Sequence, residues 1–521
     1  MDGNSGSSRI DRRAFLYGTG SLAAAAIWSQ RPSGIVRADA RLFGYPFTLG
    51  VASGDPTSDG VVLWTRLAPR PFDGGGMPDE AVKVDWQVAD DEAMTRVVRK
   101  GTTAALPEWG HSVHVEVDGL APDRWYWYQF RAAGETSPKG RTRTAPAADA
   151  RPERLRLAFA SCQHFEAGLY TAYEHMLRED LDLVIHLGDY IYEYAAEQSH
   201  VRRHIGGELS SLVDYRNRHA QYKSDPALQA MHAAVPWIVT WDDHEVDNNY
   251  ANAISEEKGV TPEEFLVRRA AGYQAYYEHM PLRRAALPKG ADMLLYRRVP
   301  WGTLAEFFVL DTRQYRTDQP CGDGNKPPCD AMLDPNATLL GGPQRDWLFD
   351  GLDHSRSTWN VLAQQVMMAR VDLALGETEL HSMDQWPGYE VDRRRVLRHL
   401  YERKIANPVV LTGDIHNHWA NDLLADFDDL GGPIVAAEFV GTSISSGGNG
   451  VDMPRSLKPA LSENPFVKFI NDRRGYVACT VSPNEWRTDY RTVEYVDRYG
   501  APLTTPATFV VESGKPGLQK A

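Results

Sequence analysis

The sequence has few cysteines, no long apolar run and fewer basic than acidic side chains. Four cysteines in 521 residues are too few for a fold held together mainly by disulfides. After the first 40 residues no segment approaches 18 consecutive apolar residues, so we expect no transmembrane segment. Lysine and arginine number 56 against 70 aspartate and glutamate, a net charge of −14. This is the wrong sign for a general nucleic-acid binder, and we expect no specific binding of nucleic acid.

The composition is that of a large globular protein. Hydrophobic residues make up 42% of the chain, charged residues 24% and aromatic residues 10%, which excludes disordered and collagen-like chains. The length predicts two to four domains, or one large catalytic domain with an appendage. The 14 tryptophans and 23 tyrosines fit a large enzyme or a carbohydrate binder equally well.

Residues 1–40 have the pattern of a targeting segment. Arg12 and Arg13 precede a weakly apolar run at 22–28, and residues 38–40 have the A-x-A form of a cleavage site. This arrangement resembles a bacterial twin-arginine signal peptide. We therefore expect the twin-arginine machinery to export the chain, which would then be periplasmic, cell-wall associated or secreted. The alternative is an amphipathic first helix.

The next 100 residues predict a small β-sandwich. Short runs of β-type alternate with Gly, Pro and Asp turns between residues 47 and 143. The turn at 120–122, followed by the aromatic run at 125–130, is typical of the corner that a tyrosine closes in immunoglobulin- or fibronectin-like sandwiches. We assign residues 41–146 to this domain and the Pro/Ala-rich stretch at 144–152 to a linker.

From residue 155 the pattern changes to α/β. Apolar strands alternate with helical stretches such as those at 169–179, 262–279 and 393–404. We expect a catalytic domain at 153–495, followed by a C-terminal tail or lid at 496–521.

Chemically active side chains follow six of the predicted strands. Ligands bind at the carboxyl ends of strands in open α/β sheets, so we expect these side chains to share one rim. Each alone has a structural explanation, because Gly-Asp is a common turn and a single histidine is usually structural. Together they offer metal ligands, proton-transfer groups and an anion clamp. The segments are Ser161–Gln163, Gly188–Glu193, Trp241–Glu245, Asp311–Gln314, Gln364–Gln365 and Thr412–His418.

Their spacing resembles that of the calcineurin-like metallophosphoesterases. The segment 188–192 has the spacing of the GDxxD motif, 243–245 that of GNHE and 413–416 that of GHxH. Cys162 stands where ordinary members have Asp, and Tyr192 replaces the last Asp of GDxxD. These substitutions are similar to those of the PhoD-type alkaline phosphatases, and the likeness covers about residues 47–495. Phrases similar to that family are VASGDPTSDGVVLWTRLAP, FASCQ, HLGDYIYEY, VTWDDHEVDNNYA, LDTRQYR, VLTGDIHNHW and EFVGTSISSGGNG.

The resemblance implies a calcineurin-like sandwich of two mixed sheets flanked by helices. It also gives the candidate ligands chemical roles. A thiolate, a phenolate and an imidazole indicate iron or zinc, and the phenolate together with the resemblance favours Fe³⁺. A neighbouring carboxylate set suits a hard cation, for which the resemblance favours one or two Ca²⁺. Cys162, Asp189, Tyr192 and His416 form the first set, and Asp189 as a bridge, Asp243 and Asp414 form the second.

The implied activity is hydrolysis of phosphate mono- and diesters by a metal-held hydroxide, with release of inorganic phosphate. His244 is the candidate to stabilise or protonate the leaving oxygen. Arg313 offers a planar fork for phosphate oxygens, with Arg316 as the weaker candidate. A phospholipase D-like diesterase and a non-catalytic cell-wall-binding protein are the alternatives. An iron oxidase would need a 2-His-1-carboxylate or haem-like set, which we do not find.

The other cysteines and the Gly-rich segment receive separate expectations. Cys321 and Cys329 lie eight residues apart in a Gly/Pro-rich loop, and in an exported protein we expect a disulfide between them. Cys479 falls in a strand-like run and should be buried and inert. The segment 442–450 has no G-K-[ST] and is not a P-loop, so we expect a flexible loop at the mouth of the site. His418 receives no role.

Overall fold

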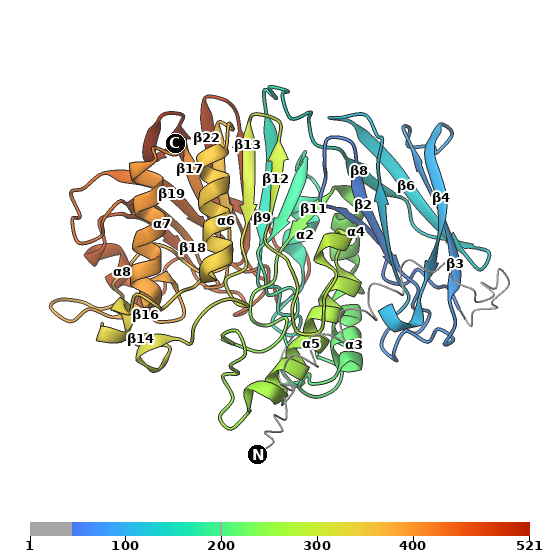
Figure 1. Ribbon diagram of the computed structural model, residues 1–521, viewed down its shortest axis with the longest axis horizontal. Helices are drawn as coiled ribbons and strands as arrows, with labels where there is room; N and C mark the ends of the chain where they lie inside the picture. The colour runs from blue at the N-terminus through green and yellow to red at the C-terminus, as the bar shows by residue number, and fades with distance from the viewer. Residues whose placement is uncertain (1–43, 198–200) are drawn as a thin grey trace, which may run out of the picture.

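Figure 1 shows the computed structural model, which describes residues 44–197 and 201–521. The predicted export signal at 1–40 lies outside these residues. Two large sheets face each other, with helices on both outer faces and a separate group of strands at one end. In the described part of the chain, no helix is both long and apolar enough to cross a membrane.

The larger sheet has ten strands, and its centre consists of buried, mostly apolar strands. β9, β10 and β11 pair in parallel, as continuous apolar runs predict. In order across the sheet the strands are β24 (Lys515–Lys520), β23 (Leu503–Glu512), β22 (Glu485–Val493), β21 (Gly475–Val481), β9 (Leu155–Ala160), β10 (Leu183–His186), β11 (Trp237–Val239), β1 (Val51–Gly54), β2 (Val61–Arg66) and β5 (Ser112–Val117).

The second sheet has seven strands, of which β13, β15, β17 and β19 run parallel. In order across the sheet they are β12 (Arg297–Trp301), β13 (Ala305–Val309), β15 (Trp359–Ala363), β17 (Pro408–Thr412), β19 (Ile434–Val440), β18 (His418–Leu424) and β20 (Val467–Asn471). A two-stranded ribbon of β14 (Asn325–Lys326) and β16 (His381–Ser382) lies apart from both large sheets.

One apolar core fills the space between the sheets, and two more lie under the outer helices. The inner core takes side chains such as Phe159, Ile185, Val361 and Leu411 from the facing strands. One outer core, rich in Tyr and Trp, lies between the ten-stranded sheet and α2–α5, and the other lies under α6 and α7. The helices are α2 (Thr171–Met176), α3 (Leu212–Lys223), α4 (Pro226–Ala234), α5 (Pro262–His279), α6 (Gly341–His354), α7 (Glu390–Glu402) and α8 (Lys458–Glu463).

The N-terminal region is less separate than the sequence predicted. Its five remaining strands form their own sheet, but β1, β2 and β5 continue the ten-stranded sheet beyond β11. The predicted tyrosine corner is present, because the Tyr126 hydroxyl accepts the N–H of Ala121 at 2.9 Å. The strands of the small sheet are β3 (Val82–Ala89), β4 (Val97–Ala105), β6 (Trp125–Ala132), β7 (Glu135–Thr136) and β8 (Gly140–Arg143).

The C-terminal segment differs from the expected tail or lid. Residues 503–520 form β23 and β24, which extend the ten-stranded sheet beyond β22. Alternation of buried Ala507, Phe509 and Val511 with more exposed neighbours packs one face of β23 on the inner core. This part of the chain is therefore a strand pair of the main sheet.

Candidate metal centre

The predicted ligands follow four parallel strands of the two sheets. Cys162 lies two residues after β9, Asp189 three after β10, Asp243 four after β11, and Asp414 two after β17. Because the two sheets are stacked, the carboxyl ends of these strands lie at one edge of the sandwich. The expectation from open α/β sheets therefore holds across two facing sheets.

The backbone at this edge is held in an unusual conformation. Cys162, Asp189, Asp414 and His416 have φ angles of 58°, 54°, 65° and 59°. Residues with a Cβ rarely adopt this left-handed region, and such strain persists only where the surroundings enforce it, often at functional sites. The turns re-aim each side chain from its strand toward the centre.

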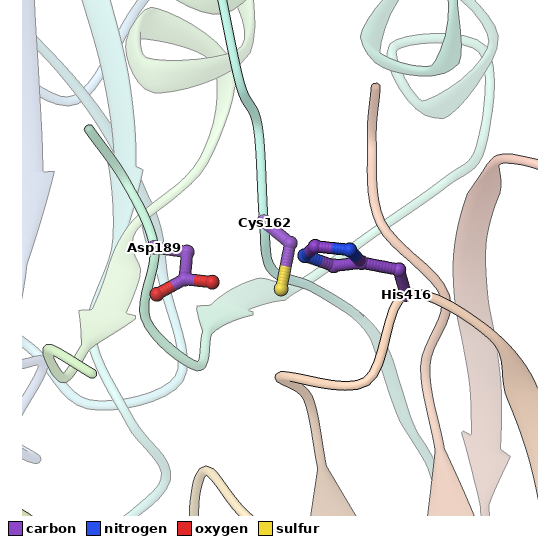
Figure 2. A group of neighbouring side chains, drawn as sticks. All are labelled: Cys162, Asp189 and His416. Atoms are coloured by element: carbon purple, nitrogen blue, oxygen red, sulfur yellow. The ribbon is translucent and has the colours of Figure 1, made fainter. Parts of the chain in front are cut away.

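A thiol, a phenol, an imidazole and a carboxylate meet on one side of the centre, and Figure 2 shows three of these residues, Cys162, Asp189 and His416. Donor atoms of Cys162, Asp189 and His416 all lie within 4.8 Å of one another. The phenolic oxygen of Tyr192 lies 3.0 Å from Asp189 Oδ2 and 3.1 Å from His416 Nε2. Burial lowers the pKa of His416 to about 3, so its imidazole is neutral, as a metal ligand requires. We call these four residues the soft set.

On the other side of Asp189 the donors are carboxylates only. Oxygens of Asp189, Asp242, Asp243 and Asp414 also lie within 4.8 Å of one another. We call these four residues the carboxylate set. Burial, with the neighbouring carboxylates, raises the pKa of Asp189 well above its usual value despite the opposing effect of His244. A divalent cation would remove that penalty.

Two orphaned oxygens test whether the residues fit metal ions. Asp189 Oδ1 and Asp242 Oδ2 are buried and have no hydrogen-bond partner among the described residues. A buried carboxylate oxygen without a partner is costly, and a coordinated cation would satisfy it. The sequence interpretation missed Asp242 as a member of this set. Its position between β11 and Asp243 was the available signal.

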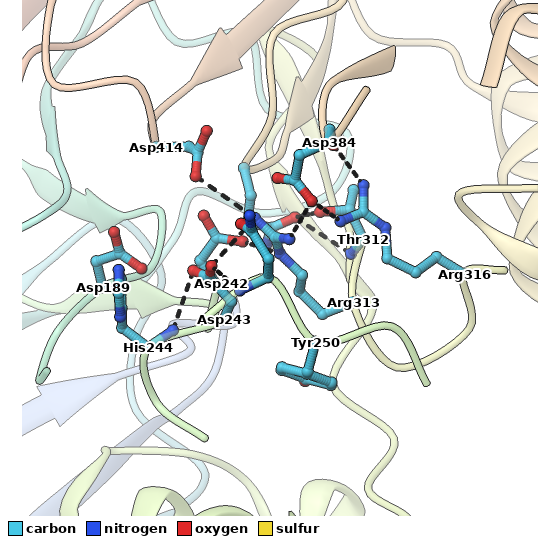
Figure 3. A network of polar contacts seen from close by, with 12 residues as sticks. Asp189, Asp242, Asp243, His244, Tyr250, Thr312, Arg313, Arg316, Asp384 and Asp414 are labelled. Atoms are coloured by element: carbon cyan, nitrogen blue, oxygen red, sulfur yellow. Dashed lines mark hydrogen bonds and ion pairs between the residues drawn. The ribbon is translucent and has the colours of Figure 1, made fainter. Parts of the chain in front are cut away.

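Arg313 has a different environment from the one predicted. Its guanidinium is fully buried, with Nε on Asp242 and Nη1 at 2.8 Å from Asp384. Nη2 donates to Asp414 at 3.4 Å, and Figure 3 shows the three aspartates around the guanidinium. The predicted phosphate clamp does not fit this geometry, because protein carboxylates already accept hydrogen bonds from the guanidinium nitrogens that would bind phosphate. Arg316, the weaker candidate, is also buried and donates to Asp384 at 2.7 Å.

His244 lies at the rim of the centre and is oriented by a carboxylate that the sequence interpretation did not single out. Its Nδ1 lies 2.7 Å from Glu193 Oε2, and its ring stacks on Tyr192 with centroids 4.1 Å apart. Burial alone would lower the pKa of His244, but Glu193, Asp243 and Asp189 together raise it well above the usual value. The imidazole can therefore carry a proton beside the metal ligands.

Glu245 connects two of the ligand-bearing loops. Its carboxylate accepts the N–H groups of Asp189 at 3.2 Å, Tyr190 at 2.6 Å and Asp242 at 2.8 Å. These bonds join the loop after β10 to the loop after β11. Glu245 is fully buried, and both of its carboxylate oxygens accept backbone N–H groups. Its effect is therefore to fix where Asp189 and Asp242 lie.

The remaining cysteines lie as expected. Cys321 and Cys329 form a disulfide. Cys479 is buried in β21, and burial raises the pKa of its thiol to about 12, which makes it unreactive. His418, which received no role, uses Nδ1 to accept the N–H of Thr442 at 3.1 Å.

The Gly-rich segment is not the flexible loop that the sequence predicted, at least in its first half. Residues 442–446 are buried, and Ser446 lies against the soft set. Flexibility would require exposed, weakly bonded backbone. Here the N–H of Ile444 donates to Ser161 O at 3.0 Å, and that of Gly475 donates to Ser443 O at 3.0 Å.

Known proteins share both the sequence and this architecture. A family model for the PhoD-like phosphatases matches residues 157–490, and one for their N-terminal domain matches 34–146. Alkaline phosphatase D of Bacillus subtilis (strain 168) is 53% identical over 520 residues, which cover 98% of this chain and 89% of that protein. The solved structure of PhoD superposes with a TM-score of 0.90 at 55% identity, over 92% of both chains.

A more distant structure supports the fold alone. Purple acid phosphatase from yellow lupin seeds superposes with a TM-score of 0.55 at 12% identity, over 89% of this chain and 73% of its own. The two family models together account for most of the described residues, from the small sheet to β22. The chain belongs to the PhoD-like phosphatase family, as a hydrolase of phosphate esters built on a metallophosphoesterase fold.

Proposed function

We propose that the chain is an exported phosphatase and phosphodiesterase with Fe³⁺ in the soft set and Ca²⁺ in the carboxylate set. The observation that carries this proposal is the position of Asp189 between the two sets, with one oxygen buried and unpartnered. Thiolate, phenolate and imidazole donors favour a transition metal, whereas an all-oxygen set favours a hard cation. Two cations at such a centre would supply an activated water and charge neutralisation for a phosphoryl group.

The chain's own residues perform the remaining steps. His244, held through Nδ1 by Glu193, is placed to give a proton to the leaving oxygen. Arg313 keeps Asp242 and Asp414 apart and oriented without touching substrate. In this proposal Arg313 is a positioning residue.

Export and domain limits belong to the same proposal. The twin-arginine pattern supports residues 1–40 as a signal that directs export and is cleaved from the mature protein. The five-stranded sheet supports a small N-terminal domain within 41–146, and the two large sheets support a catalytic domain over 153–495. The strands β1, β2 and β5 make the contact between the two domains continuous.

The test combines metal content with substrate rates. Purified chain would be analysed for iron and calcium, then assayed on nitrophenyl phosphate, bis-nitrophenyl phosphate and phosphatidylcholine, with and without Ca²⁺. Cys162→Ala should lose iron and activity together. Cys479→Ala is the matched control, because this thiol is equally buried but lies in β21, and it should keep both. Full activity with iron retained in Cys162→Ala would contradict the iron assignment.

A further inference from the structure

The hydroxyl of Ser446 lies against the soft set without belonging to it. Its oxygen is 2.8 Å from the phenolic oxygen of Tyr192 and 2.7 Å from the carbonyl oxygen of Cys162. Ser446 is 2% exposed, so bulk water does not compete for these contacts. One side chain therefore touches two of the four residues of the soft set.

The hydroxyl has a single proton for two acceptors. Its oxygen accepts the N–H of His164 at 3.1 Å, which leaves the proton to point at Cys162 O or at Tyr192 Oη. Without a cation, the Tyr192 hydroxyl donates to Asp189 Oδ2 and is a neutral, weaker acceptor. A phenolate bound to a trivalent ion is a charged acceptor, and hydrogen bonds to charged acceptors are the stronger ones. The proton of Ser446 then favours Tyr192.

Hydrogen bonds from Ser443 and Arg474 hold the loop that carries Ser446. Ser443 Oγ donates to the carbonyl of Ser446 at 2.7 Å, and Arg474 Nη1 donates to Ser443 Oγ at 2.8 Å and to the same carbonyl. Gly447, at φ +83°, leaves room for Arg474, since a Cβ there would lie 3.0 Å from Nη1. The hydroxyl of Ser446 is thus fixed by the fold.

We propose that Ser446 is a positioning residue for the iron site, whose hydroxyl hydrogen-bonds the phenolic oxygen of Tyr192 and limits its electron donation to the metal. The inference rests on the proposed function, because it takes Fe³⁺ as the ion of the soft set. Partners of this kind orient ligands and tune the metal that the ligands hold. Loss of the hydrogen bond leaves the phenolate electrons at higher energy. Charge transfer from tyrosinate to iron then needs less energy.

The experiment follows that charge-transfer absorption in the purified, iron-containing protein. Ser446→Ala should retain iron, with at most about a 10- to 100-fold weaker affinity, and its visible band should move to longer wavelength. Ser445→Ala is the matched control, because that hydroxyl donates to His164 O at 2.9 Å and does not touch Tyr192. Ser446→Thr keeps a hydroxyl. Both of these variants should keep the wild-type band.

Two outcomes would overturn the proposal. One is an unshifted band in Ser446→Ala with iron bound. The other is loss of iron that Ser446→Thr does not restore, because packing rather than the hydroxyl would then be responsible. Failure of the iron assignment itself has a different signature. In that case the wild-type protein would contain no iron, or Tyr192→Phe would leave its whole visible absorption, tyrosinate and thiolate components together, unchanged.

Discussion

The two halves of the centre are held in place by different forces. Around the soft set the hydrogen bonds from Ser446 are neutral ones, made by its hydroxyl to the Tyr192 phenol and to the Cys162 carbonyl. Around the carboxylate set the contacts are ionic, with the guanidinium of Arg313 shared among Asp242, Asp384 and Asp414. A neutral hydrogen bond limits the electron density that a donor gives to a transition metal but does not add a charge of its own. Ionic support lets four acids stay together before a cation arrives.

Asp189 belongs to both sets, so its substitution should affect both halves of the centre at once. We expect Asp189→Asn to remove iron and calcium together and to lower phosphatase activity by more than the about 100-fold typical of supporting residues. Metal analysis and nitrophenyl phosphate assays would measure both effects. If only one metal disappeared, Asp189 would not bridge the two sets.

Arg313→Lys should affect the carboxylate set more than the soft set. An ammonium cannot reproduce the fork, and breaking a buried ion pair costs about 3–5 kcal/mol. We expect loss of calcium before iron, with lower stability in denaturant unfolding. Arg316→Lys makes the same chemical change at a residue whose hydrogen bonds, among the described residues, go to Asp384, and it should have a smaller effect. Equal effects of the two substitutions would contradict the role given to Arg313.

Glu193→Gln tests the support of His244, whose ring lies beside Tyr192 of the soft set and near Asp243 of the carboxylate set. The raised pKa of His244 means that the imidazolium is present at low pH and is lost as pH rises through that pKa. Removing the Glu193 charge lowers the pKa, so the alkaline limb of kcat should move to lower pH. We expect a rate loss of about 10- to 100-fold with both metals retained. An unmoved limb would show that Glu193 does not act through His244.

Tyr126→Phe gives the smallest effect, far from either half. It removes the hydroxyl that closes the corner onto Ala121, which should cost about 1 kcal/mol. The denaturant midpoint should fall slightly, whereas metal content and kcat should not change. A change in kcat would mean that the small sheet is coupled to the centre more strongly than its contacts suggest.

The sequence predicted the candidate metal ligands better than the residues that hold those ligands in place. Cys162, Asp189, Asp243 and Asp414 follow apolar strands, and that local pattern alone was enough to expect them at one rim. The partners of Arg313 could not be predicted, because Asp384 follows the two-residue strand β16, which is too short to leave a strand pattern in the sequence. Ser446 and Glu193 matter only through contacts with residues far away in the chain. The strands at the two ends of the ten-stranded sheet were not predicted for a similar reason, because the pattern of a strand does not show which strand it pairs with.

The order of strands in the ten-stranded sheet has a consequence for how the chain folds. β9, which leads to Cys162, has β10 on one side and β21 on the other, more than 300 residues later. During synthesis β9 remains an unpaired edge until residues 475–481 emerge from the ribosome. Sheets closed by such distant contacts form slowly, and exposed edges invite aggregation meanwhile. Cys162, which follows β9, therefore reaches its final surroundings only when synthesis is nearly complete.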